Sequence, residues 1–246
     1  MSDSWGKCAK FSIAEWHGIA GGIESKKDWT RWAKNEYQLQ TTLPDARLDT
    51  IPPQIKRRLD GLGRCIMSAS EQCIAIIKKE PAVISVSRHG NLRLMSNLIQ
   101  HVRDQEDISP ASFAHSVHNR FSSLISIVAG YHGVNAAYSS VGDGFPVALA
   151  EATALIEDSP RLSVLLLAYE PEIPKEYKEI VSNPWVPHVA VFVLQAANNN
   201  QLNYSISRQT ECFSGSSERG TCFPLLRTML NKTNERDGFW EYQRCE

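Results

Sequence analysis

Residues 116–152, with the sequence SVHNRFSSLISIVAGYHGVNAAYSSVGDGFPVALAEA, decide the fold class of this protein. Val134–Ser140 is predicted to be a strand, SSVGDG at 139–144 a glycine turn, and Pro146–Glu157 a helix. Pro146 suits the first turn of a helix, and the helix is apolar almost all round, so we expect it to be buried on most sides. Many α/β enzymes carry a nucleophile in such a turn, but this turn has neither a cysteine nor a G-x-S-x-G pattern.

The segments on either side of this stretch alternate between predicted strands and helices. We expect strands at residues 11–20, 82–90, 162–169, 189–196, 201–207 and 238–245, and helices at 28–38, 54–79, 91–105, 119–131 and 223–231. The runs at 162–169 and 189–196 are apolar almost throughout, which is typical of strands covered on both faces. The pattern predicts an α/β fold, a layered sandwich formed by a single domain over residues 1–246.

Three details of this prediction concern individual segments. Gly61 and Gly63 are expected to break the helix at 54–79. In the helix at 91–105, the inner side is expected to carry Leu94, Leu98, Ile99 and Val102. The polar stretch 198–220 is expected to be a long loop after a short strand.

Composition excludes several classes of function. Of the 246 residues, 42% are apolar and the net charge is −1, so no basic surface indicates nucleic acid or an anionic membrane. The N-terminal MSDSWGKCAK lacks the apolar core of a signal peptide, and the apolar runs are too short to span a bilayer. The six cysteines are scattered without metal spacing. We expect a cytoplasmic protein with free thiols, no structural metal and no cofactor.

Four motifs together resemble the N-terminal half of β-ketoacyl-ACP synthases, in the thiolase-like superfamily. They are SRHG (87–90), ISPASFAHSVHN (108–119), LISIVAG (124–130) and GDGFPVALAEA (142–152). The resemblance extends over residues 10–246 and includes the segments IPPQIKRRLDGLGRCIMSA and LLAYEPEIPKEY. It implies a thiolase-like half, with layered α/β/α architecture and a mixed central sheet.

The resemblance also shows a departure from the active family. Active synthases carry a cysteine nucleophile in the turn before the buried helix, assisted by the helix N-terminus and by two histidines of the C-terminal half. The matching position here is Val141, give or take one residue, and the sequence has no cysteine between Cys73 and Cys212. The sequence is expected to end before the half that supplies the histidines. No catalytic residue is therefore assigned.

The resemblance is strongest to chain-length-factor subunits of type II polyketide synthases, whose short versions are associated with aryl polyene clusters of Gram-negative bacteria. It implies a non-catalytic subunit that forms a heterodimer with a β-ketoacyl-ACP synthase in polyene or polyketide chain elongation. Acyl carrier protein is a second candidate partner. The residues expected at the partner interface are Ser116, His118, Asn119, Phe121, Val134, Asn135, Ala136, Ala137, Tyr138, Ser139 and Ser140.

Other interpretations remain open at this stage. Ser140 could serve a stand-alone serine acyltransferase or hydrolase, although its hydroxyl and that of Ser139 also suit the backbone groups of a turn. A homodimeric scaffold that binds acyl carrier protein is a further alternative. His115 and His118 lack a third metal ligand nearby, and Asp143 is expected to cap the following helix.

Overall fold

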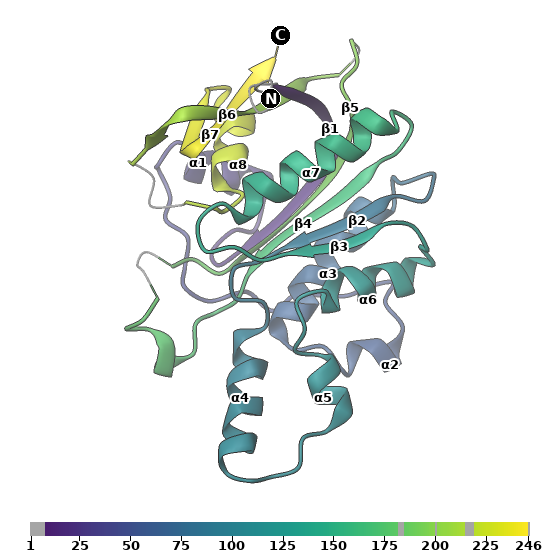
Figure 1. The fold of residues 1–246 in the computed structure, drawn as a ribbon, viewed down its shortest axis with the longest axis vertical. Coiled ribbons are helices and arrows are strands. Elements are labelled where there is room, and N and C mark those ends of the chain that lie inside the picture. Colours follow the sequence, from purple (N-terminus) through teal and green to yellow (C-terminus); the bar gives the residue numbers. More distant parts are fainter. Residues whose placement is uncertain (1–7, 182–184, 200, 215–218, 246) are drawn as a thin grey trace, which may run out of the picture.

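The computed structural model describes residues 8–181, 185–199, 201–214 and 219–245. A seven-stranded mixed sheet forms the centre, with strand order β3-β2-β4-β5-β1-β6-β7 (Figure 1). The strands are β1 (Ala9–Ala20), β2 (Ala82–Val86), β3 (Asn135–Tyr138), β4 (Val164–Glu170), β5 (His188–Ala196), β6 (Asn203–Phe213) and β7 (Glu235–Cys245). The neighbours β3, β2 and β4 are parallel, whereas β5 is antiparallel to both β4 and β1. The predicted mixed sheet is confirmed.

Helices cover both faces of this sheet, which confirms the predicted α/β/α layers. The α-helices are α1 (Lys26–Ala33), α2 (Pro53–Lys56), α3 (Gly61–Ile74), α4 (Leu92–Arg103), α5 (Pro110–Ala114), α6 (Arg120–Ala129), α7 (Gly144–Asp158) and α8 (Phe223–Asn231). A short 3-10 helix, η2, spans Lys175–Tyr177. Figure 1 shows α7 on one side of the sheet and α3 and α6 on the other.

Two hydrophobic cores hold the layers together. One core joins α1, α7 and α8 to the first face of the sheet, through residues such as Trp32, Leu149 and Leu226. The other joins α3 and α6 to the second face, through residues such as Ile66 and Ile125. Residues of β4 and β5 alternate between the two cores, which is why both strands are apolar throughout their length.

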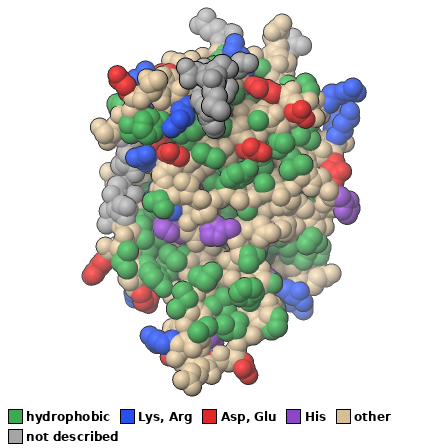
Figure 2. Space-filling model, in the orientation of Figure 1, with side chains coloured by type: hydrophobic (Ala, Val, Ile, Leu, Met, Phe, Trp, Pro, Cys, Tyr) green, Lys and Arg blue, Asp and Glu red, His purple; other side chains and the backbone are tan. Residues whose placement is uncertain are grey.

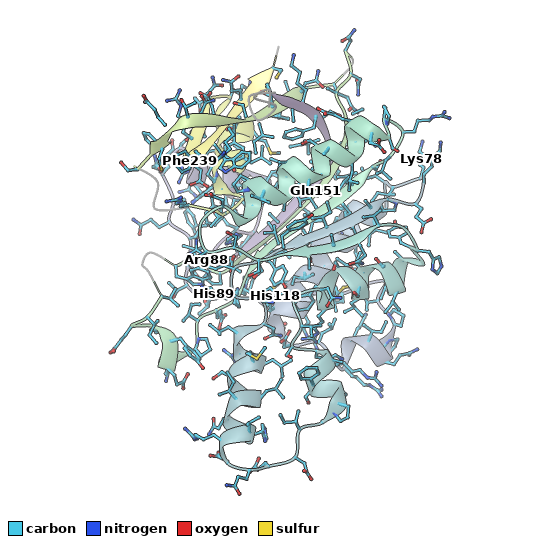
Figure 3. The ribbon with its side chains drawn as sticks, viewed as in Figure 1. Lys78, Arg88, His89, His118, Glu151 and Phe239 are labelled. Carbon is cyan, nitrogen blue, oxygen red and sulfur yellow. The ribbon has the colours of Figure 1, made fainter. Side chains whose placement is uncertain are left out.

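Helix α7 is buried on one side rather than on most sides. Phe145, Leu149 and Ala152 face the sheet, whereas Val147 and Glu151 are exposed. The prediction of burial on most sides was wrong because the apolar residues of α7 extend onto a face that no other described element of the chain covers. Figure 3 shows Glu151 on this helix.

The segment of α4 and α5, here called the α4–α5 arm (residues 92–114), extends beyond the end of the sheet in Figure 1. Of the residues expected on the inner side of this helix, Leu98 is buried and Leu94 half-buried, but Ile99 is 55% and Val102 is 59% exposed. The prediction was wrong for these two because the arm leaves the body of the sandwich, so only one narrow edge of α4 packs against it.

Two predicted boundaries differ from the structure. The break in the helix at 54–79 lies at residues 57–60, and Gly61 begins α3 because the Asp60 carboxylate caps it by accepting the Gly63 amide at 2.8 Å. The strand predicted at 201–207 is present as β6 but continues to Phe213, paired with β7, where a long loop was predicted. Residues 1–7, 200 and 215–218, which belong to predicted polar segments, lie outside the described residues.

Candidate functional site: the turn between β3 and α7

The turn of residues 139–143 connects the edge strand β3 to α7, as the sequence predicted. Val141, which the resemblance matches to within one residue to the family's cysteine position, is 82% exposed. The Ser139 hydroxyl donates to the carbonyl of Arg88 at 3.2 Å, and the Ser140 hydroxyl accepts the amide of Asp143 at 3.4 Å. Both serine hydroxyls therefore bind backbone groups at the turn.

A distant segment of the chain, Arg219–Gly220, closes the turn. The amide of Phe145 in the first turn of α7 donates to the Gly220 carbonyl at 3.1 Å. Gly220 has φ +76, and a Cβ on it would lie 2.5 Å from the Gly142 carbonyl oxygen, so only glycine permits this approach. The Gly220 amide donates to Asp237 Oδ2 at 2.7 Å. A helix N-terminus that could stabilise an anion is thus bonded to the protein's own backbone at Phe145.

Charged side chains hold this closure in place. Arg219 Nη2 lies 3.5 Å from Asp143 Oδ1, and Arg88 Nη2 donates to the Arg219 carbonyl at 3.0 Å. Asp143 occupies the N-cap position of α7, but its side chain makes no capping hydrogen bond. The prediction of an aspartate cap was wrong because this carboxylate turns to Arg219 instead.

Glu170 lies buried at the carboxyl end of β4. Its carboxylate accepts the Arg88 amide at 2.7 Å and the Ser87 hydroxyl at 3.4 Å. Burial raises the pKa of Glu170 to about 7, although the hydrogen bond from the Arg88 amide and the Arg88 charge oppose the rise. This buried carboxyl fixes the loop that presents Arg88 to the closing segment.

Arg88, His89 and His118 lie near one another where the strands end and the α4–α5 arm begins (Figure 3). The His89 ring packs 4.7 Å from the Trp185 ring, and burial, followed by the Arg88 and His118 charges, lowers the pKa of His89. Gly90 has φ +58, and a Cβ there would lie 3.2 Å from His118 Nε2. Among the described residues, no group of three or more histidine, cysteine or acidic side chains could hold a metal.

The residues predicted at a partner interface lie in two segments of the chain, one at the edge strand β3 and one at the start of α6. Asn135, Ala136, Ala137 and Tyr138 form the edge strand β3, next to the exposed Val134. In contrast, Ser116 is buried and donates to the Phe113 carbonyl. Asn119 precedes α6 and is exposed.

Phe121 requires a correction, because its ring is part of this chain's own core. It is 1% exposed and packs edge-on against Tyr169, with 5.2 Å between the ring centroids. A side chain enclosed in this way cannot reach a partner's surface. The alternative weighed from the sequence was a core position, and the structure favours it.

Sequence reasoning missed two features of this region. The contact of Arg219 and Gly220 with the turn has no local signal, because these residues are far from Asp143 in the sequence. The second feature is an apolar surface on the arm, formed by Met95, Ile99, Val102 and Phe113, and Figure 2 shows hydrophobic side chains gathered on this lower part of the molecule. From the sequence, Ile99 and Val102 were assigned to the inner side of α4, and no assignment was made for Met95 or for Phe113, which lies on α5.

A three-layer sandwich with parallel β2, β3 and β4, and a turn from the edge strand into a core helix, is the architecture of the thiolase-like condensing enzymes. The chain belongs to the β-ketoacyl synthase N-terminal domain family, whose model matches residues 29–236. A comparison with curated protein sequences finds no match. Among the helices of the described residues, none is both long and apolar enough to cross a bilayer.

Solved structures share this fold at low sequence identity. A chain of the ketosynthase (ApeO) in complex with its chain length factor (ApeC) from Xenorhabdus doucetiae has a TM-score of 0.79 and 24% identity, covering 96% of this chain and 99% of that one. A chain of the ishigamide ketosynthase/chain length factor has a TM-score of 0.65 and 11% identity, covering 82% of this chain and 68% of that one. A chain of AntDE:AntF, a type II PKS acyl-carrier protein in complex with its ketosynthase, has a TM-score of 0.59 and 12% identity, covering 76% of this chain and 62% of that one.

Proposed function

We propose that this protein is a non-catalytic, chain-length-factor-like subunit that forms a heterodimer with a β-ketoacyl-ACP synthase in polyketide chain elongation, of the aryl polyene class. The observation that carries the proposal is the turn between β3 and α7. Val141 stands where a nucleophilic cysteine is expected, and the Phe145 amide donates to Gly220. The Phe145 amide, one of the N–H groups at the N-terminus of α7, is therefore not available to a thiolate at this turn, where a free helix N-terminus lowers a cysteine pKa.

The open edge of the sheet supports pairing with a second protein. Strand β3 ends the sheet, so one side of its backbone has no neighbouring strand within the described chain. Unpaired strand edges promote aggregation unless they are covered, and a strand of the partner synthase is the cover that we propose. Val134, Asn135, Ala137 and Tyr138 would contact that partner directly.

The apolar surface of the α4–α5 arm supports the same interface. Ile99, Val102 and Phe113 are each more than half exposed, although each is large and apolar. Contiguous surfaces of this kind mark protein interaction sites in soluble proteins. His118 and Asn119 lie between this arm and α6, so we assign them to the same contact surface.

These assignments give each component of the proposed complex a separate role. The partner's cysteine would carry out the decarboxylative condensation of acyl and malonyl groups. This chain would stabilise the partner subunit and would limit the space available to the growing product. Residues 1–246 would act as one domain in the cytoplasmic complex. Acyl carrier protein would deliver the substrates and is the proposed third component, as AntDE:AntF includes such a carrier with its ketosynthase.

The test combines assembly and activity. We would purify the chain alone, its candidate synthase alone, and the two together, using size-exclusion chromatography with light scattering and a malonyl-dependent elongation assay. A 1:1 complex that elongates, with neither subunit active alone, supports the proposal. A synthase that reaches full activity without this chain would contradict it, and a stable homodimer that binds carrier protein but no synthase would favour a scaffold.

A further inference from the structure

A cleft of about 360 Å³ is lined by residues of α2, α5 and α6 and of the segments next to them. Its volume falls within the range of about 300–1,000 Å³ that is usual for small-molecule sites. Most of its wall is apolar, and the residues concerned are Ile55, Leu59, Ala114, Val117, Leu124 and Ile127. A site with this lining suits an aliphatic chain.

Positive groups gather at one part of the same cleft. Arg58, His115 and Arg120 all line it, and the Arg120 side chain is only 7% exposed. Arg120 Nη2 donates to the Arg58 carbonyl at 3.3 Å, which places its guanidinium beside the Arg58 backbone. Burial, then the charges of Arg120 and Arg58, lowers the pKa of His115, consistent with a positive potential at this part of the cleft.

The negative charge available to this group is small. Arg120 Nη1 lies 3.9 Å from Asp60 Oδ2, too far for a hydrogen bond. Asp60 also accepts the Gly63 amide at 2.8 Å and the Asn91 side-chain amide at 2.6 Å. A buried guanidinium needs a close anion, so one carboxylate shared with other donors leaves the buried Arg120 undercompensated, whereas Arg58 is exposed to water.

We propose that this cleft binds a medium-chain aliphatic carboxylate, with the carboxylate held by Arg58 and Arg120 and the chain packed along the apolar wall. Guanidinium groups match the geometry of a carboxylate and bind it through two parallel hydrogen bonds. Each buried methylene of the chain adds hydrophobic stabilisation at Ile55, Leu124 and Ile127. The inference uses none of the residues of the turn or of the strand edge, but Ala114 and Asn119, which also line the cleft, belong to the arm and to the contact surface proposed above.

The first test is isothermal titration calorimetry of the full chain, in whichever soluble form it purifies, with decanoate and with decanol. If only the complex with its synthase is soluble, the synthase alone is the reference. Decanoate is expected to saturate one site, and decanol to bind at least about tenfold more weakly, since it lacks the charge. Equal binding of decanol and decanoate would overturn the proposal.

Matched variants locate the site. Arg58→Ala is expected to weaken decanoate binding about tenfold, the effect of losing one charge-assisted hydrogen bond. Arg57→Ala is the control, because this neighbour is also exposed and cationic but does not line the cleft. Ile127→Asp should also weaken binding, and since Ile127 is 74% exposed, the fold should tolerate it. Equal affinity in the Arg57 and Arg58 variants would overturn the assignment.

A second measurement follows the His115 ring by NMR during a pH titration. Bound decanoate should raise the pKa of His115, because a negative charge then offsets Arg58 and Arg120, whereas decanol should leave it unchanged. If decanoate leaves the His115 pKa unmoved, the carboxylate does not lie beside the arginines and the proposal fails. It also fails if decanoate does not bind and an acidic segment of the synthase fills the cleft instead.

Discussion

At the scale of single residues, Gly220 allows the segment of residues 219–220 to pack closely against the turn of residues 139–143. We expect Gly220→Ala to destabilise the fold by more than the roughly 1–2 kcal/mol that a left-handed alanine costs, because its Cβ would also lie 2.5 Å from the Gly142 carbonyl. Gly130→Ala is the control, because Gly130 has φ +70 and nothing lies within 4 Å of its Cβ position. Urea denaturation of the two variants measures the difference, and equal losses would show that the close approach is absent.

Val141 offers a direct test of whether the turn can activate a nucleophile. We expect Val141→Cys to fold normally, because the side chain is exposed, and to give no elongation activity. Its thiol should titrate near the free value of about 8.5, since the Phe145 amide is already bonded to Gly220. Peptide-resolved alkylation across pH gives this value, with the exposed Cys212 as an internal reference. A pKa below about 7.5 would show that the turn still stabilises a thiolate.

Glu170 should make stability depend on pH. Its pKa is raised from 4.5 to about 7, so the folded protein holds the proton more tightly than the unfolded chain. Its contribution therefore falls as the pH rises from about 4.5 to about 7, by a total of about 3 kcal/mol. We expect Glu170→Gln to remove this fall. The melting temperature of the variant, measured relative to that of the native protein, should therefore rise between pH 5 and pH 8.

The opposite contribution of His188 makes that comparison necessary. Burial lowers the pKa of His188 from 6.5 to about 4, so its contribution is present above 6.5 and is lost as the pH falls toward 4. The two residues partly cancel in the native protein, and only the difference between the native protein and the Glu170 variant isolates the carboxyl. If that difference is constant with pH, the carboxyl is not perturbed as described.

At the scale of elements, the hydrogen bonds of β3 determine which of its residues face a partner. Val83 and Ser87 donate their amides to the carbonyls of Val134 and Tyr138, at 2.8 Å and 3.2 Å. The N–H and C=O groups of successive residues point to opposite sides of a strand. Those of Ala136 therefore also point toward β2, while those of Asn135 and Ala137 point to the open edge.

This alternation gives a matched pair of substitutions. We expect Ala137→Pro to keep the fold, because proline is tolerated on an open edge, but to weaken the complex with the synthase at least about tenfold by removing an outward amide. Ala136→Pro should instead disrupt the pairing with β2 and lower the melting temperature. Circular dichroism and light scattering separate the two effects. A folded Ala137 variant that binds the synthase normally would exclude pairing through this edge.

The helices show what sequence periodicity could and could not predict. The apolar residues of β4 and β5 predicted two covered strands because each residue faces one of two cores. In α4, the same kind of signal was misleading, since Ile99 and Val102 are apolar but exposed. Periodicity identifies an apolar side of an element but not the identity of its cover, which here we propose to be another protein.

At the scale of the whole molecule, the architecture was predictable and the closure of the candidate site was not. The layers and the mixed sheet were predicted from the alternation of elements together with the resemblance carried by motifs such as residues 108–119 and 142–152, whereas the strand order was not. The Arg219–Asp143 ion pair and the buried Glu170 arise from the juxtaposition of distant segments. No local pattern records such contacts, because each side chain alone suits an ordinary loop or strand end.

The proposed heterodimer makes stability depend on the synthase. A partner that binds only the folded chain stabilises it by RT ln(1 + [L]/Kd), about 2.7 kcal/mol at a hundredfold excess over Kd. We therefore expect the melting temperature to rise with synthase concentration, and the chain alone to be poorly soluble because β3 and the arm surface are then exposed to water. Ala137→Pro should reduce this rise at the same synthase concentration, because it raises Kd. A well-behaved monomer whose melting temperature ignores the synthase would mean that the strand edge and the arm are not parts of one binding surface.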